Sequence, residues 1–503
     1  MNRINRLWTL VVYDLRALRR ERGAIALLAA ALVLAGFGLF EGNRFRQHAA
    51  SAQQAAAVQE TGARTAATQL AARYFADPQS PQFDNELWYR TPVDVRGYAF
   101  RSHLGFAARP PLAGAALAIG QADLQPAYVQ VRAESMESVR TATEIDHPAR
   151  LAAGRYDLLY FTVYLWPLIV LALCASVLTQ DRESLRLRSL LLQGVASHHI
   201  VFAQAAARGL LATVLLGIVV AALALAGGAV RADSAGVTAL AWWGLLLAAY
   251  SGFWIAVAML VCAVARDRMH AAFYGFGAWL LLAIVLPATV DVAARAAAPM
   301  PPREAYVQAL RDAGDLVAAN RVHSLARFYD SHPEWRPAKT KVGDVPASVS
   351  RLQRAEELEQ AMAVVDDRYA RAAAKRAAWS ERLSWLSPVT LANAGFARVA
   401  GNDNARQQAF IDDVTRHQRQ LRAYFQQAIQ QAALGDERQP CPRACLGGYG
   451  FRDFDAVPRY TPAPTLAMQP APAPGFWSLA AWAALFLALA GLALRRERTA
   501  QLR

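Results

Sequence analysis

Lysine is almost absent from this chain, and so are the short motifs that mark most enzymes. Only three of its 53 basic residues are lysines, and none of the three follows a glycine. A nucleotide-binding P-loop needs the pair Gly-Lys, so the chain has no such site of its own. It also lacks H-E-x-x-H, G-x-S-x-G and any Cys/His cluster at metal-site spacing. We therefore expect no active site, bound cofactor or resident metal ion.

Cysteine is equally scarce, with four residues among 503. Cys174 and Cys262 lie in apolar runs, where cysteine usually serves as a small buried residue. Cys441 and Cys445 lie in a polar region, and a short disulfide between them fits an oxidising compartment. The alternative is a metal site, but two thiolates need further ligands and none lies at close spacing.

Charged residues are nearly missing from six long apolar runs. Each run approaches the roughly 20 residues that cross a hydrocarbon core of about 30 Å. The sequence thus predicts an α-helical integral membrane protein with six transmembrane helices, at residues 24–40, 158–178, 208–230, 237–265, 271–292 and 476–494. Arg155, Asp157 and Asp291 fall at span ends, where snorkelling or mutual pairing explains them. A proton- or ion-coupled carrier is disfavoured, because such proteins carry charges within their spans.

The arginines indicate an orientation. Arginines flank the predicted spans in residues 1–23, in the loop 179–207, in the turn 266–268 and in the tail 495–503. These segments share one side if the six spans alternate, and the positive-inside rule makes that side cytoplasmic. The formal net charge of +14 is then a consequence of topology, and no nucleic-acid partner is expected.

Two long polar insertions, 41–157 and 293–475, then face outward, and we expect both to be mostly helical. The Ala/Gln-rich stretch Gly42–Ala76 has no proline and predicts a helix that continues outward from the first span. Residues 303–329, 348–385 and about 403–433 predict three helices in the second insertion. The proline-rich residues 462–474 predict an extended linker to the last span.

The N-terminal segment 1–23 predicts an amphipathic helix on the membrane surface. Leu7, Trp8, Val11 and Leu15 recur at helical spacing on one face, and arginines occupy the others. A basic face, an apolar face and a tryptophan are typical of an interfacial helix. The alternative is an ordinary basic flank of the first span.

The loop 179–207 is the strongest candidate for contact with a partner protein. Charged and polar residues come first, and leucines at helical spacing follow: Asp181, Arg182, Glu183 and Ser184, then Leu190 and Leu191. A short helix that is charged at one end and apolar on one face can dock into a groove of another protein. The alternative is a helix that rests on lipid beside the membrane.

Several short stretches together resemble one known family. They are His147-Pro148-Ala149-Arg150-Leu151, Gly154-Arg155-Tyr156-Asp157-Leu158, Leu165-Trp166-Pro167-Leu168, Asp181-Arg182-Glu183-Ser184, Ser331-His332-Pro333-Glu334 and Leu386-Ser387-Pro388. In this order and topology the chain resembles the permease subunits of ABC-2 type exporters. The similar subgroup has one large outward domain between spans one and two and another between spans five and six.

The resemblance implies a fold like that of type V ABC exporters and a location in the bacterial inner membrane, with cytoplasmic termini and two periplasmic domains. Two permease subunits, identical or homologous, would pair with cytoplasmic P-loop ATPase subunits that hold ATP and Mg²⁺. Residues 1–23 would be the connecting helix and the loop 179–207 the coupling loop, in which Asp181, Arg182 and Glu183 touch the ATPase. The family usually has Gly-Thr-Leu where this chain has Ser184-Leu185-Arg186, so the ATPase is expected to be a dedicated partner or the pairing asymmetric.

The expected function is therefore that of a permease subunit that couples ATP hydrolysis in its partner to export. The competing hypothesis is a non-transporting scaffold or mechanical transmitter that anchors a periplasmic assembly. Membrane lipid is a partner in either case, and the residues do not name a transported substrate.

Overall fold

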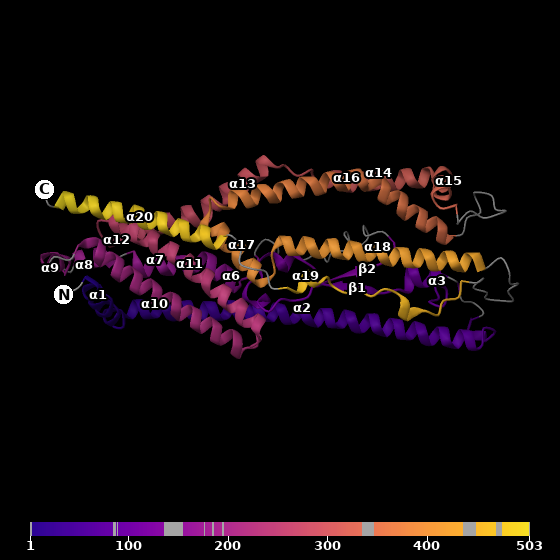
Figure 1. Cartoon of the computed structure of the whole chain (residues 1–503), viewed down its shortest axis with the longest axis horizontal. Coiled ribbons are helices and arrows are strands. Elements are labelled where there is room, and N and C mark those ends of the chain that lie inside the picture. The colour runs from indigo at the N-terminus through magenta and orange to yellow at the C-terminus, as the bar shows by residue number, and fades with distance from the viewer. Residues whose placement is uncertain are drawn as a thin grey trace.

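The computed structural model describes residues 3–501 apart from 84–86, 88, 135–153, 176, 184–185, 194–195, 334–346, 436–448 and 469–474. The molecule is elongated and mostly helical, with a helix bundle at one end and a domain with a small sheet toward the other (Figure 1). Both chain termini lie at the outer end of the bundle. We call this the near end, and the opposite end, which α18 reaches, the far end.

The described residues include six helices long and apolar enough to cross a membrane, the predicted number. They are α2 (Arg22–Ala76), α10 (Ser197–Ala226), α11 (Ser234–Val264), α20 (Gly475–Gln501) and two composite helices, Leu158–Thr179 and Arg268–Ala297. The first composite comprises α6 (Leu158–Tyr160), the π-helical segment η5 (Phe161–Leu165), α7 (Trp166–Cys174) and the start of α8 (Val177–Glu183). The second comprises α12 (Arg268–Trp279), the π-helical segment η6 (Leu280–Val285) and α13 (Leu286–Ala297). This architecture is that of a multi-pass α-helical membrane protein.

α10, the third span along the chain, extends well beyond its predicted span at its start. It begins at Ser197 rather than at Arg208, so that Arg208 and the pair His198-His199 lie within α10 instead of at its border or in a loop. The added residues are rich in alanine, a strong helix former, so the helix starts well before the continuous apolar run. Arg208 is consequently a charged residue inside a candidate span, which the sequence analysis did not anticipate.

The second and fourth spans form the centre of the bundle, because their apolar windows are 76% and 72% buried while the other four are at most 33% buried. Pro167 has no N–H group and interrupts the hydrogen bonds of its helix next to η5. Side chains of neighbouring helices compensate. The Tyr250 hydroxyl donates to the carbonyl oxygen of Val163 at 2.7 Å, and the Trp279 indole N–H to that of Tyr164 at 2.9 Å. These contacts hold η5, just before α7, against α11 and α12.

The far domain takes residues from both insertions. The first supplies the distal part of α2, η1 (Pro81–Phe83), α3 (Val95–Gly97), η2 (Tyr98–Ser102) and a two-stranded antiparallel sheet, β1 (Gly105–Ala108) and β2 (Tyr128–Val131), in which Gly105 pairs with Val131. Between the strands, η3 (Ala115–Leu117) packs on the bundle core, and η4 (Gly120–Leu124) follows it. The second supplies α18 (Asn404–Gly435), η9 (Phe454–Ala456) and α19 (Pro464–Ala467). Tyr98 from the first insertion packs on Phe425, Phe451 and Phe454 from the second. The two insertions therefore share one hydrophobic core.

The remaining helices of the second insertion lie along one side of the molecule. α14 (Arg303–Ala319), α15 (Arg321–Ser331) and α16 (Ala347–Ser384) continue from α13, and α16 runs beside α13 and α14 (Figure 1). The helix predicted at 303–329 is interrupted at Asn320, where the backbone leaves the helical region. α17 (Pro388–Ala400) instead packs on α11 and α20, at the end of the bundle that is next to the far domain (Figure 1).

Asp157 joins the far domain to the bundle. Its carboxylate accepts hydrogen bonds from the backbone N–H groups of Tyr160 and Ile119, both at 2.7 Å, and of Gly120 at 3.1 Å. Burial raises the pKa of this carboxyl, and the three N–H donors oppose the rise. The predicted snorkelling or pairing with Arg155 is wrong for Asp157, because Asp157 caps the start of the second span and holds η4 there. The guanidinium of Arg155 lies over the Phe45 ring.

Candidate functional site

The candidate site is a group of buried polar contacts at the near end, where α1 (Arg3–Leu18), α8 and α9 (Arg186–Leu192) meet α10. α1 lies against α10 with Leu10, Asp14 and Leu18 buried and Val11 packed on the bundle core. Leu10, Asp14 and Leu18 recur at intervals of four, which places them on one face of α1. Trp8 lies off that face with 68% of its surface exposed, where a membrane interface would accept it.

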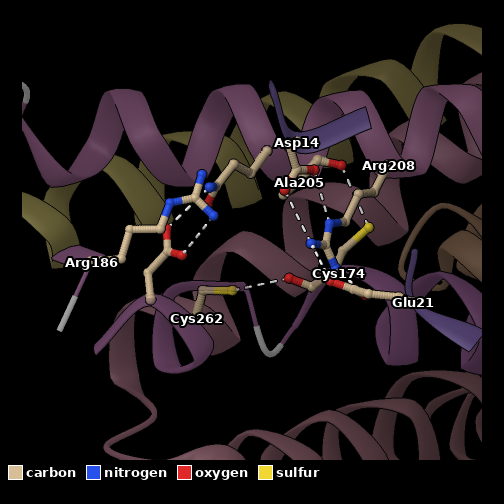
Figure 2. Close-up of polar contacts among 9 residues, drawn as sticks. Asp14, Glu21, Cys174, Arg186, Ala205, Arg208 and Cys262 are labelled. Atoms are coloured by element: carbon tan, nitrogen blue, oxygen red, sulfur yellow. Dashed lines mark hydrogen bonds and ion pairs between the residues drawn. The ribbon is translucent and has the colours of Figure 1, made fainter. Parts of the chain in front are cut away.

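Arg208 is the centre of the site. Its guanidinium binds both carboxylate oxygens of Asp14, at 2.9 and 3.0 Å, and both oxygens of Glu21, at 3.3 and 3.2 Å (Figure 2). Asp14 is 1% and Arg208 5% exposed, so this is a buried ion group with two-point geometry on each carboxylate. It fixes α1, and the elbow that leads from α1 into α2, to the third span.

A second buried contact joins Asp181 of α8 to Gln204, which lies one turn before Arg208 on α10. The Asp181 carboxylate accepts a hydrogen bond from the Gln204 amide at 3.0 Å and lies 3.5 Å from the Arg186 guanidinium. Burial raises the pKa of Asp181, and the contacts with Gln204 and Arg186 oppose the rise. Arg186 also lies over the Tyr13 ring, 4.3 Å from its centroid.

Gln204 and Arg208 are four residues apart and so lie on one face of α10. Through them α10 holds both the start of the α8–α9 loop and the surface helix α1. No group in this arrangement is a nucleophile next to a base. The arrangement can transmit movement, because a displacement of α8 must either move α10 or break the contact between Asp181 and Gln204.

Two thiols lie directly beneath these contacts. Cys262 Sγ is 3.1 Å from the carbonyl oxygens of both Cys174 and Ala175, at the end of α7, and Cys174 Sγ is 3.4 Å from the carbonyl oxygen of Ala205 (Figure 2). Carbonyls at a helix end have no partner within the helix, and here the Cys262 thiol lies beside them. Both cysteines are buried, as expected for small residues inside a span.

The other predicted site residues are only partly described. Leu190 is half-buried against the bundle core, and Leu15 is half-buried on α1. Ser184, Cys441 and Cys445 lie outside the described residues, as do the side chains of Leu7, Arg182, Glu183 and Leu191. The predicted disulfide or metal site at Cys441 and Cys445 and the predicted contacts of Arg182 and Glu183 therefore stay predictions. Within the described part of the chain, no group of three or more His, Cys, Asp or Glu residues is placed to hold a metal ion.

The sequence analysis missed the two α10 residues and Asp14. Asp14 interrupts the apolar pattern of α1 at a position that a core-facing leucine could occupy. Arg208 occupies the start of an apolar run, where a membrane-flanking arginine is common. One signal could have predicted that Asp14 pairs with Arg208. Asp14 is an acid on the buried face of one helix, and Arg208 is a lone arginine at the edge of a span.

Comparison with known proteins assigns only part of the chain. Residues 303–438, which run from the start of α14 to just beyond α18, match a family described as a domain of unknown function, DUF3526. No curated protein and no solved structure matches the chain. The matched segment includes α18 of the far domain and the helices that lie beside it, whereas the near-end site lies outside it.

Proposed function

We propose that this chain is the membrane-spanning permease subunit of an ATP-driven exporter of the ABC-2 type. The observation that carries the proposal is the connection of α1 and the α8–α9 loop to one face of α10, through Arg208 and Gln204. A coupling loop must be tied to the spans that it moves, and this loop is. The six spans and the family resemblance of the sequence support the same conclusion.

In this proposal the near end is cytoplasmic and the far domain periplasmic, in the bacterial inner membrane. A P-loop ATPase partner binds ATP and Mg²⁺, and its closure pushes α8 and α9. The movement passes from Asp181 to α10 and from Arg208 to α1, as a rigid-body displacement of packed helices. A second permease copy or a homologue completes the transporter.

The role of Asp181 differs from the one expected from the family. Asp181 is 3% exposed and faces Gln204, so it holds the loop from within rather than touching the ATPase. Arg182 and Glu183 follow it on α8 and are the residues we assign to the ATPase contact. The division gives separate predictions for the two sets of residues.

The test is purification of the tagged chain in a mild detergent, with identification of co-purifying proteins and an assay of ATP hydrolysis. We expect a P-loop ATPase near one-to-one stoichiometry, and its loss in the double variant Arg182→Ala/Glu183→Ala. Gln193→Ala, an exposed change just beyond α9, is the matched control and should retain the ATPase. Recovery of periplasmic proteins without any ATPase would overturn the proposal.

A scaffold that transmits force to a periplasmic assembly is the second candidate. It is favoured by α2, one helix of 55 residues that passes from the near end of the bundle into the shared far-domain core. The two candidates differ in one observable. An exporter in reconstituted membranes hydrolyses ATP faster when its substrate is present, whereas a scaffold shows no such stimulation by any soluble ligand.

A further inference from the structure

A cleft of about 360 Å³ opens at the near end between four of the spans. Its apolar wall includes Ala24 and Leu27 of α2 and Ala172 and Leu173 of α7. Its polar wall is formed by Glu21, Arg208 and Arg268. The volume lies at the lower end of the range for small-molecule sites, about 300–1,000 Å³.

The position of the cleft identifies the kind of molecule that reaches it. α2 and α12 begin beside it, at Arg22 and Arg268, and α7 ends beside it, at Cys174. Helices that start and stop together mark the level at which the apolar membrane interior meets water. Ala172 is exposed and Leu27 only half-buried, so the apolar wall continues onto the surface that faces lipid. An occupant with a polar head and an apolar chain meets matching surfaces here.

The charges around the cleft select the sign of that head. The negative charge of Glu21 is met by Arg208, and Arg208 is in turn bound by Asp14. Arg268 lines the cleft and is exposed, and together these four groups sum to zero. The exposed Arg19, Arg20 and Arg22 of the neighbouring elbow and Arg266 of the α11–α12 turn outnumber the one acid of that turn, Asp267, and leave the region positive.

We propose that this cleft binds the headgroup of an anionic phospholipid, with the phosphate near Arg268 and an acyl chain along Leu27 and Leu173. Basic pockets between spans on the cytoplasmic side bind such headgroups in other membrane proteins. Glu21 is the more exposed carboxylate of the Arg208 group, at 30% against 1% for Asp14. A phosphate in the cleft therefore lies beside the weaker of the two contacts that hold the α1–α2 elbow. This proposal needs only the membrane location of the chain, and it stands or falls independently of the exporter function.

Native mass spectrometry of the full chain in detergent, with phosphatidylglycerol or phosphatidylcholine added, tests the proposal. We expect one preferred phosphatidylglycerol. Arg268→Gln should weaken its binding about fivefold, the effect of one basic group at a membrane surface. Arg266→Gln, two residues away and equally exposed, does not line the cleft and should change the affinity less than twofold. Equal effects of the two variants, or equal binding of the two lipids, would overturn the proposal.

A second pair of variants tests the location without altering charge. Ala172→Trp places a large ring in the cleft and should abolish the preferred lipid, whereas Leu210→Trp, on an exposed part of α10 outside the lining, should keep it. Retention of the lipid by Ala172→Trp would place the site elsewhere. Displacement of the lipid by millimolar inorganic phosphate would also refute the proposal, since the cleft would then be a site for free anions.

Discussion

The near-end site and the far-domain core both bury titratable side chains, but they do so in opposite ways. At the near end the Arg208 guanidinium is paired with two carboxylates, those of Asp14 and Glu21. In the far domain His103 is 4% exposed between the rings of Tyr98 and Phe425, and neither of its ring nitrogens has a hydrogen-bond partner among the described residues. Burial, together with the charges of Arg64 on α2 and His417 on α18, lowers the pKa of His103 to about 4.

The difference follows from what each region must hold together. Charged groups carry a large desolvation penalty, which is offset only when partners with good geometry are present. The near end joins separate helices through such partners, so its contacts are directional. The far domain joins two insertions through aromatic packing, and there a neutral imidazole serves as one more ring. Stability should thus fall strongly when a charge is removed at the near end. In the far-domain core it should fall when a charge is added.

The largest effect is expected from Arg208→Ala. The change leaves Asp14 buried without its partner, which should lower the free energy of unfolding by about 3–5 kcal/mol. It should also free the α1–α2 elbow, so that trypsin cleaves faster after Arg19, Arg20 and Arg22. Chemical denaturation in detergent and timed proteolysis measure the two results.

Arg231→Ala is the control for this prediction. Arg231 forms an ion pair with Asp233 at 2.8 Å, but its side chain is 85% exposed. Exposed pairs contribute at most about 1 kcal/mol. If the Arg208 and Arg231 variants lose similar stability, burial is not what gives the near-end contacts their strength.

The buried His103 of the far domain should make the stability of the protein depend on pH. Unfolded His103 binds a proton below about 6.5, whereas the buried side chain does so only below about 4. Stability should therefore fall as pH decreases from 6.5 to 4, by about 3 kcal/mol for this residue. His103→Phe should remove that part of the fall, measured as the difference between wild type and variant in denaturation at pH 7 and pH 4.5. A variant with the wild-type slope would mean that other groups cause the acid sensitivity.

The smallest effect is expected from Gln204→Leu. This change preserves the size of the side chain but removes the hydrogen bond to the buried Asp181 carboxylate. It should lower stability by about 1.5 kcal/mol, the contribution of a hydrogen bond to a charged group. Gln408→Leu, which removes an exposed glutamine–aspartate contact on α18, should change it by less than about 0.5 kcal/mol. An equal loss in both would show that Asp181 does not need Gln204.

Local pattern was sufficient for much of the fold. The helix predicted over Gly42–Ala76, continuous with the first span, is confirmed, because this stretch is rich in alanine and contains no proline to end the helix. Continuous apolar runs likewise predicted the six spans, since length and composition alone decide which segments can cross a membrane.

Contacts between distant parts of the sequence were not predictable in the same way. Asp14 and Arg208 are separated by 194 positions, and Arg64 and Phe454 by 390. The shared core of the insertions depends on Tyr98 meeting Phe425, and no periodicity within either segment specifies its partner. Asp181 shows the same limit, because its charge predicts a surface role until the position of Gln204 is known.

Because α2 is one continuous helix, a small rotation at its start moves its distal end by a much larger distance. At about 1.5 Å per residue its 55 residues extend roughly 80 Å, from the α1–α2 elbow to the far domain. A tilt of about 5° at the elbow, applied to a rod of that length, displaces its distal tip by roughly 7 Å. A displacement of a few angstroms made at the near end is therefore larger when it reaches the far domain, without any change of fold in between.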